Sequence, residues 1–182
     1  MPLPGGAADK FGNRYEGRWT VACMLDVMDE RADSIRLEPP GPDGEGAEFR
    51  VRKGSELAYH QVKRQHTTGR WTLSELERER VLSQFAEKLQ EPNAQCFFVS
   101  GNDAYQVHEL SEWAKRSVSW EEFDSEFLRA AQKRKDFQQL CRSFGDLPEV
   151  ETYLYLKRIT AEAQMQVRRG ALGSRPGGNR VN

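Results

Sequence analysis

Apolar residues recur at steps of three and four near the start of the chain, and the pattern then changes to alternation. The first pattern is that of an amphipathic helix, expected from about Phe11 to about Glu30. The alternating pattern predicts three strands, over 34–38, 48–52 and 57–63. A loop rich in proline and glycine separates the first two strands, and a tight turn at 53–56 joins the last two. A helix followed by a three-strand meander is therefore expected.

Helical spacing returns in the later part of the chain, with one short apolar run inside it. Thr72 and Glu75 predict a capping box that opens a helix ending at Pro92. The apolar run at 95–100 is typical of a buried strand. Further helices are expected at 105–115, after 119, and from near 148 to about 169. The predicted fold class is α/β, with a core of helix, three-strand meander, helix and strand, and a C-terminal α-helical extension.

The composition along the chain predicts one domain with a tail at each end. Residues 1–8 are expected to be a flexible N-terminus. Residues 9–169 form the domain, with its core at about 11–100 and its helical extension at about 105–169. Residues 170–182 are rich in glycine and arginine and are typical of a linker, so a further domain is expected after them.

Charge and cysteine content narrow the class of protein. The 182 residues carry a net charge of −1, which gives no overall electrostatic attraction to nucleic acid. Basic residues nevertheless gather in one stretch, at Arg50, Arg52, Lys53, Lys63, Arg64 and Arg70. The three cysteines are far apart and show no zinc-site spacing. No signal peptide or apolar run of membrane-spanning length is visible, so a cytoplasmic protein without a membrane partner is expected.

The predicted hairpin brings three chemically different side chains together. Side chains two apart on a strand share a face. Glu48, Arg50 and Arg52 are therefore expected on one face of the second strand, and Gln61 and Lys63 on one face of the third strand. Antiparallel pairing places the start of one strand beside the end of the other. A carboxylate, an amide and an ammonium should therefore meet at one strand end.

This set of groups suits metal-assisted phosphodiester hydrolysis. Mg²⁺ or Mn²⁺ would bind the Glu48 carboxylate, the Gln61 side-chain oxygen and the backbone carbonyl of Val62. Lys63 would orient the attacking water and stabilise the negative charge that develops. Glu38, at the end of the first strand, competes with Glu48 as the metal ligand, but the strand of Glu48 pairs directly with that of Gln61.

These residues resemble the PD-(D/E)xK, or restriction-endonuclease-like, nuclease superfamily, in which a strand ends on the pattern written here as Gln61-Val62-Lys63. More narrowly, Gly5-Gly6, Tyr15-Glu16 and the run 59–65 resemble the double-stranded-DNA endonuclease domain at the N-terminus of bacterial antiphage defence proteins, including STAND-type NTPases. The similarity covers about residues 5–100. It implies that Glu16 adds an acidic group to the site.

The resemblance also implies a function and partners. It implies an endonuclease domain that hydrolyses phosphodiester bonds of double-stranded DNA, as the effector of an antiphage protein that self-associates through a downstream NTPase module. Arg64, His66 and Arg70, next to the third strand, are the candidate DNA contacts. Gln61 stands where many members carry an acid, which leaves a second interpretation open. In that interpretation the same fold binds DNA or a protein partner without cleaving anything. His60 should point away from the site and serve a structural role.

Overall fold

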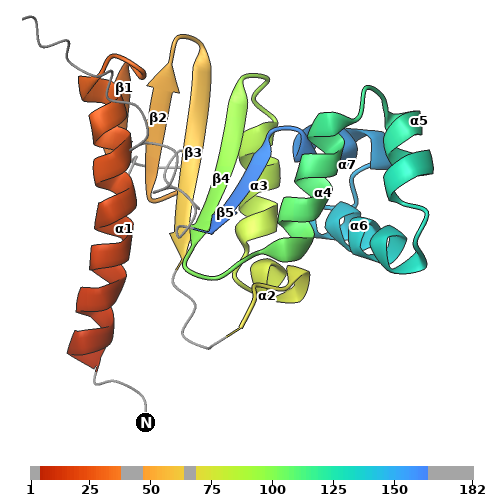
Figure 1. The fold of residues 1–182 in the computed structure, drawn as a ribbon, viewed down its shortest axis with the longest axis horizontal. Coiled ribbons are helices and arrows are strands. Elements are labelled where there is room, and N and C mark those ends of the chain that lie inside the picture. Colours follow the sequence, from red (N-terminus) through yellow and green to blue (C-terminus); the bar gives the residue numbers. More distant parts are fainter. Residues whose placement is uncertain (1–4, 38–46, 64–68, 164–182) are drawn as a thin grey trace, which may run out of the picture.

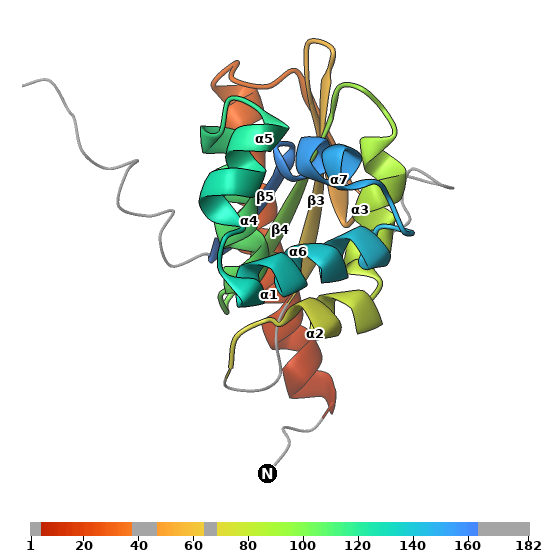
Figure 2. The same ribbon diagram turned by 90° about the vertical axis from the view of Figure 1, so that its right-hand side faces the viewer.

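A five-stranded mixed sheet with helices on both faces forms the framework of the protein (Figures 1 and 2). This computed structural model describes residues 5–37, 47–63 and 69–163, and within the first range it describes side chains from residue 17 onward. The strands are β1 (Ser34–Leu37), β2 (Phe49–Lys53), β3 (Glu56–Lys63), β4 (Ala94–Ser100) and β5 (Ile159–Ala163), and they lie side by side in that order. The first three are antiparallel, whereas β4 and β5 run parallel to β3.

Helix α1 (Gly5–Met28) covers one face of the sheet. Trp19 and Cys23 of α1 pack against Phe49, Val62 and Val99 from three neighbouring strands and form the smaller apolar cluster. The predicted first helix is confirmed, although it begins six residues earlier than the apolar spacing indicates. These contacts fix which strand residues face α1, and the residues between them must face the other side.

The remaining helices pack on the opposite face, toward the β3–β5 end of the sheet (Figure 2). They are α2 (Leu73–Arg78), α3 (Val81–Leu89), α4 (Tyr105–Arg116), the short α5 (Trp120–Glu122), the π-helical turn η2 (Phe123–Phe127), α6 (Ala131–Ser143) and α7 (Glu149–Leu156). They bury the larger apolar cluster, which includes Phe85, Phe98, Leu110 and Phe137, each no more than 2% exposed. No described residue of β1 or β2 belongs to this larger cluster.

The predicted hairpin is confirmed, with Lys53 paired to Glu56 across a two-residue turn. Gly54 has a φ of +58°, a conformation that suits the first position of such a turn and that other residues rarely adopt. The N–H of Gly54 also donates to the carboxylate of Asp33 at 2.6 Å. The turn is thus fixed both by its own conformation and by the end of the preceding helix–strand connection.

The helix expected to run from Thr72 to Pro92 is two helices. The capping box predicted from Thr72 and Glu75 is present at the start of α2. The chain then leaves the helical conformation at Arg80, where φ is +61°, and α3 starts at Val81. The break turns α3 so that Val81, Leu82, Phe85, Ala86 and Leu89 are buried against the sheet.

The helix predicted from 148 to 169 is wrong in its second half. Helix α7 ends at Leu156, and β5 follows as a fifth strand beside β4. Arg158, between them, donates to the carbonyls of Leu89 and Glu91 at 2.6 and 2.8 Å, which satisfies orphan carbonyls at the end of α3. The alternation of Ile159 and Ala161 buries one face of β5, a pattern too short to outweigh the helical spacing before it. The extension after 105 is therefore not purely helical.

Among the described residues, no helix combines the length and the apolar character that crossing a bilayer requires.

Candidate active site

Glu48 lies in a bend immediately before β2, beside the end of β3. Its backbone N–H donates to the carbonyl of His60 at 2.9 Å. Its carboxylate accepts a hydrogen bond from the backbone N–H of Val62, also at 2.9 Å. Because strand N–H groups point along the plane of the sheet, the carboxylate occupies the place that a backbone acceptor of β2 would otherwise take.

The strand position expected for Glu48 is therefore wrong by one residue, since β2 begins at Phe49. Ala47 belongs to the larger apolar cluster and Phe49 to the smaller one, so side chains do not alternate regularly through Glu48. Glu48 is thus not a third member of the face that Arg50 and Arg52 share. The structure nevertheless brings its carboxylate to the residue that lies between Gln61 and Lys63.

Gln61 is buried on the face of the sheet that α3 covers, with 3% of its surface exposed. Its amide nitrogen donates to the side-chain oxygen of Gln84 on α3 at 3.3 Å. Its own amide oxygen is buried and has no hydrogen-bond partner. A buried acceptor without a partner costs about 1–3 kcal/mol, so a water or ligand that donates a hydrogen bond to this oxygen would be stabilising.

Lys63 is the last residue of β3 and is partly exposed. It pairs in register with Ser100 at the end of β4. Within the described part of the chain its ammonium forms no hydrogen bond or ion pair, so the charge is not neutralised by a described carboxylate.

The expected ligands at this corner are oxygen atoms. Mg²⁺ and Mn²⁺ prefer oxygen ligands, and Mg²⁺ commonly keeps several waters. Glu48 offers a carboxylate and Gln61 an unpartnered amide oxygen. A strand residue directs its N–H and C=O to the same side, so the carbonyl of Val62 faces the side where Glu48 lies. In the described ranges no group of three or more His, Cys, Asp or Glu side chains could hold a metal, so a cation here would depend on water and substrate oxygens.

Of the other predicted site residues, the structure describes only the side chain of Arg70. Glu38, Arg64 and His66 lie outside the described residues, as does the side chain of Glu16. Arg70 is described and exposed, and its guanidinium lies over the ring of Tyr105, 5.6 Å from the ring centre. Arg70 therefore lies next to the start of α4.

His60 has the structural role that its position on the strand predicts. It is 5% exposed and stacks between the rings of Phe49 and Phe97, each 4.6 Å from it centre to centre. Its Nδ1 accepts a hydrogen bond from the indole N–H of Trp19 at 3.1 Å, which couples α1 to the sheet. Burial lowers the pKa of His60 from 6.5 to about 4.

We expect the stability of the protein to fall steeply as the pH drops from about 6.5 to about 4 because of His60. The unfolded chain binds a proton at the ordinary pKa, whereas the folded protein resists it, so the unfolded state binds more protons across this window. The total loss is on the order of 3 kcal/mol. Urea unfolding curves recorded over this pH range would measure it. His60→Gln should flatten the dependence; an unchanged slope in His60→Gln would assign the effect to other groups.

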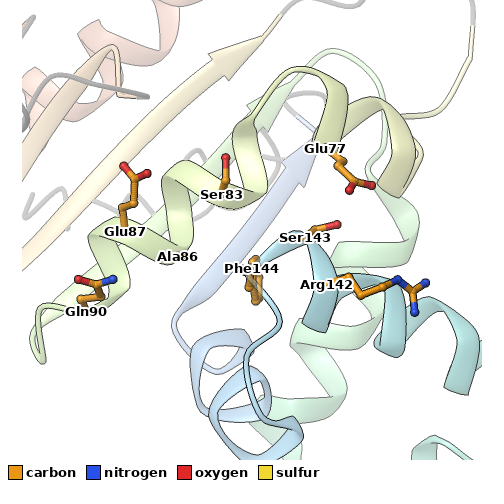
Figure 3. Close-up of a pocket in the computed structure, with 9 residues that line it drawn as sticks. Glu77, Ser83, Ala86, Glu87, Gln90, Arg142, Ser143 and Phe144 are labelled. Atoms are coloured by element: carbon orange, nitrogen blue, oxygen red, sulfur yellow. The ribbon is translucent and has the colours of Figure 1, made fainter.

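Two hollows of the molecule lie away from this corner. One, of about 350 Å³, lies between α3 and the end of α6 and has Glu77, Arg142 and the buried Ser143 in its lining (Figure 3). The other, of about 460 Å³, is beside the exposed edge of β5 and is lined in part by His108 and Glu162. Burial raises the pKa of Glu162. Neither hollow is lined by Glu48, Gln61 or Lys63, and the position of Glu162 becomes apparent only once β5 is recognised as a strand.

The structure is an α/β protein in which the Glu48 carboxylate lies beside Val62, between the buried Gln61 and the partly exposed Lys63 at the end of β3. No protein-family model matches the chain, and no curated protein or solved structure matches it. What the protein does must therefore be inferred from its residues and their geometry.

Proposed function

We propose that this chain is a restriction-endonuclease-like domain that hydrolyses phosphodiester bonds of double-stranded DNA with the help of Mg²⁺ or Mn²⁺. The observation that carries the proposal is the hydrogen bond from the backbone N–H of Val62 to the Glu48 carboxylate. It holds an acidic group beside the strand end that carries Gln61 and Lys63. An acidic group next to a strand that ends on Gln61-Val62-Lys63 is the arrangement that the resemblance to this nuclease superfamily implies.

The order of the elements supports the same proposal. One helix covers one face of the sheet, three antiparallel strands follow, and a strand parallel to the third comes after two further helices. The helix, meander, helix and strand order is what the resemblance implies for this superfamily. The fifth strand and the helices after β4 are additions to that core.

Each residue of the corner has a distinct chemical task in this proposal. Glu48, Gln61 and the carbonyl of Val62 would hold the cation, which when bound neutralises phosphate charge and lowers the pKa of a bound water. Gln84 holds the amide of Gln61 so that its oxygen, not its nitrogen, is available. Lys63 would orient the attacking water and stabilise the additional negative charge on the phosphate. Its ammonium has no described carboxylate as a partner, so its charge is available for this role.

The small number of carboxylates favours a second candidate function. The described residues include no group of three or more metal-ligating acidic, histidine or cysteine side chains, and Gln61 replaces the acid that many nucleases of this type carry. A fold with weakened metal capture could instead bind DNA or a protein partner without cleaving it. We therefore treat cleavage as the property to be tested first.

Incubation of supercoiled plasmid with the purified protein, with Mg²⁺, Mn²⁺ or EDTA, tests the proposal directly. We expect nicked and linear products with either cation and intact plasmid with EDTA. Because the resemblance implies that cleavage depends on self-association, the assay includes a version of the chain fused to a dimerising helix. Intact plasmid in every condition, including the dimeric one, would favour the module without catalytic activity. An antiphage role and activation by a downstream module would be tested only after cleavage is observed.

A further inference from the structure

Three arginines lie together on the part of the sheet that the helices leave uncovered. Ile35, Phe49 and Val51 point toward α1, so the residues next to them on each strand point to the opposite face. These are Arg36 of β1 and Arg50 and Arg52 of β2. On that face the helices pack over β3 to β5, and no described residue of β1 or β2 takes part in the apolar cluster that they bury.

The register of the two strands brings the arginines into direct opposition. Arg36 pairs with Arg50, and Ser34 pairs with Arg52, so the third guanidinium is diagonal to the first. Like charges directly opposite each other on a sheet are destabilising in themselves. Neither Arg36 nor Arg52 has an ion pair within the described part of the chain, and both are exposed.

The uncovered part of the face ends at β3, where Tyr59 is buried beneath the helices and only 1% exposed. Arg50 pairs with Tyr59 of β3, two residues before Gln61. Beneath the helices, the ammonium of the buried Lys88 on α3 lies 5.2 Å from the centre of the Tyr59 ring, and Glu91 accepts a hydrogen bond from the Tyr59 hydroxyl. Within the described residues of β1 and β2, this face carries Ser34, Arg36, Arg50 and Arg52, so that part of the face is positively charged.

We infer that Arg36, Arg50 and Arg52 form a phosphate-binding surface for the backbone of duplex DNA. Guanidinium groups bind phosphate oxygens through paired N–H donors, and such contacts position a nucleic acid without reading its sequence. Lys63 lies on the same face of the sheet, four residues after Tyr59, so a duplex held there could reach the proposed active site. That last statement rests on the proposed function, whereas the binding itself does not.

Fluorescence anisotropy with a labelled DNA duplex of arbitrary sequence, in EDTA so that no cleavage occurs, tests the inference. The variant Arg36→Glu/Arg52→Glu should bind about tenfold more weakly or worse, and the slope of log affinity against log salt should fall by about two. The control Arg116→Glu/Lys135→Glu changes the net charge equally, at exposed positions on α4 and α6. It should bind within about twofold of the unaltered protein.

The outcomes separate the surface from the nuclease. Equal losses in both double variants, or no DNA binding by the unaltered protein, would overturn the inference. In the double variant, the new glutamate at position 36 lies opposite Arg50. The melting temperature of this variant should therefore be unchanged or higher, which separates lost binding from lost folding. Should the double variant fail to fold, Arg52→Gln alone provides the same comparison with Arg116→Gln. Arginine-dependent binding together with intact plasmid in every cleavage condition would support the surface and contradict the proposed function.

Discussion

Replacing Lys63 by alanine is expected to lower the rate of plasmid cleavage by about 100-fold or more, because an ammonium aimed at developing phosphate charge contributes about that much. The fold should not change, since within the described residues the Lys63 side chain is partly exposed and makes no hydrogen bond or ion pair. Cleavage is measured from the initial loss of supercoiled plasmid at saturating Mg²⁺. Circular dichroism and the melting temperature report whether the variant is folded.

Lys53→Ala is the matched control for this experiment. Lys53 lies at the other end of β2, next to the hairpin turn, where it pairs in register with Glu56. Its removal takes away the same charge from the same sheet and should leave cleavage unchanged. Nicking by Lys63→Ala at the rate of the unaltered protein would refute the role given to this lysine, whatever happens to the control.

Glu48 should separate into a structural and a chemical contribution when two substitutions are compared. Glu48→Gln keeps an oxygen that can accept from the N–H of Val62, so the free energy of unfolding should change by about 0.5 kcal/mol or less. Glu48→Ala leaves that N–H without its acceptor and should destabilise the protein by about 1–2 kcal/mol. Both substitutions remove the negative charge, so both should abolish cleavage and weaken Mn²⁺ binding.

Urea unfolding measures the first contribution, and calorimetric titration with Mn²⁺ measures the second. The informative variant is Glu48→Gln, which is expected to be stable but inactive. If it cleaves plasmid and binds Mn²⁺ like the unaltered protein, the carboxylate merely completes the hydrogen bonding of a strand end. That result would leave Gln61, with its buried amide oxygen, unexplained.

The parts of the fold that the sequence predicts are those fixed by local patterns. The meander follows from alternation and from a turn that needs Gly54, and the start of α2 follows from the side-chain pair Thr72 and Glu75. These features depend on residues within a few positions of one another. For the same reason the hairpin alone could place Glu48 close to the end of β3.

The parts that could not be predicted depend on residues distant in sequence. Strand β5 is stabilised by its pairing with β4, more than 50 residues earlier in the chain. The position of Arg158, just before β5, is fixed by hydrogen bonds to carbonyls at the end of α3. The opposition of Arg36 and Arg50 requires the register across a loop outside the described residues. The bend at Glu48 likewise shifts the strand by one residue, which no alternation pattern reveals. Tertiary pairing, not local preference, decides each of these.

The register of the parallel strands has a practical consequence for anything attached to the domain. Lys63 pairs with Ser100, and Ser100 pairs with Ala163, so the three residues stand in one row across the sheet. Two strand spacings amount to about 10 Å, which is the separation expected between the backbones of Lys63 and Ala163. A bulky group joined directly after Ala163 would begin about 10 Å from Lys63, the residue proposed to act on the phosphate, so fusions for assays are better placed at the N-terminus or on a long spacer.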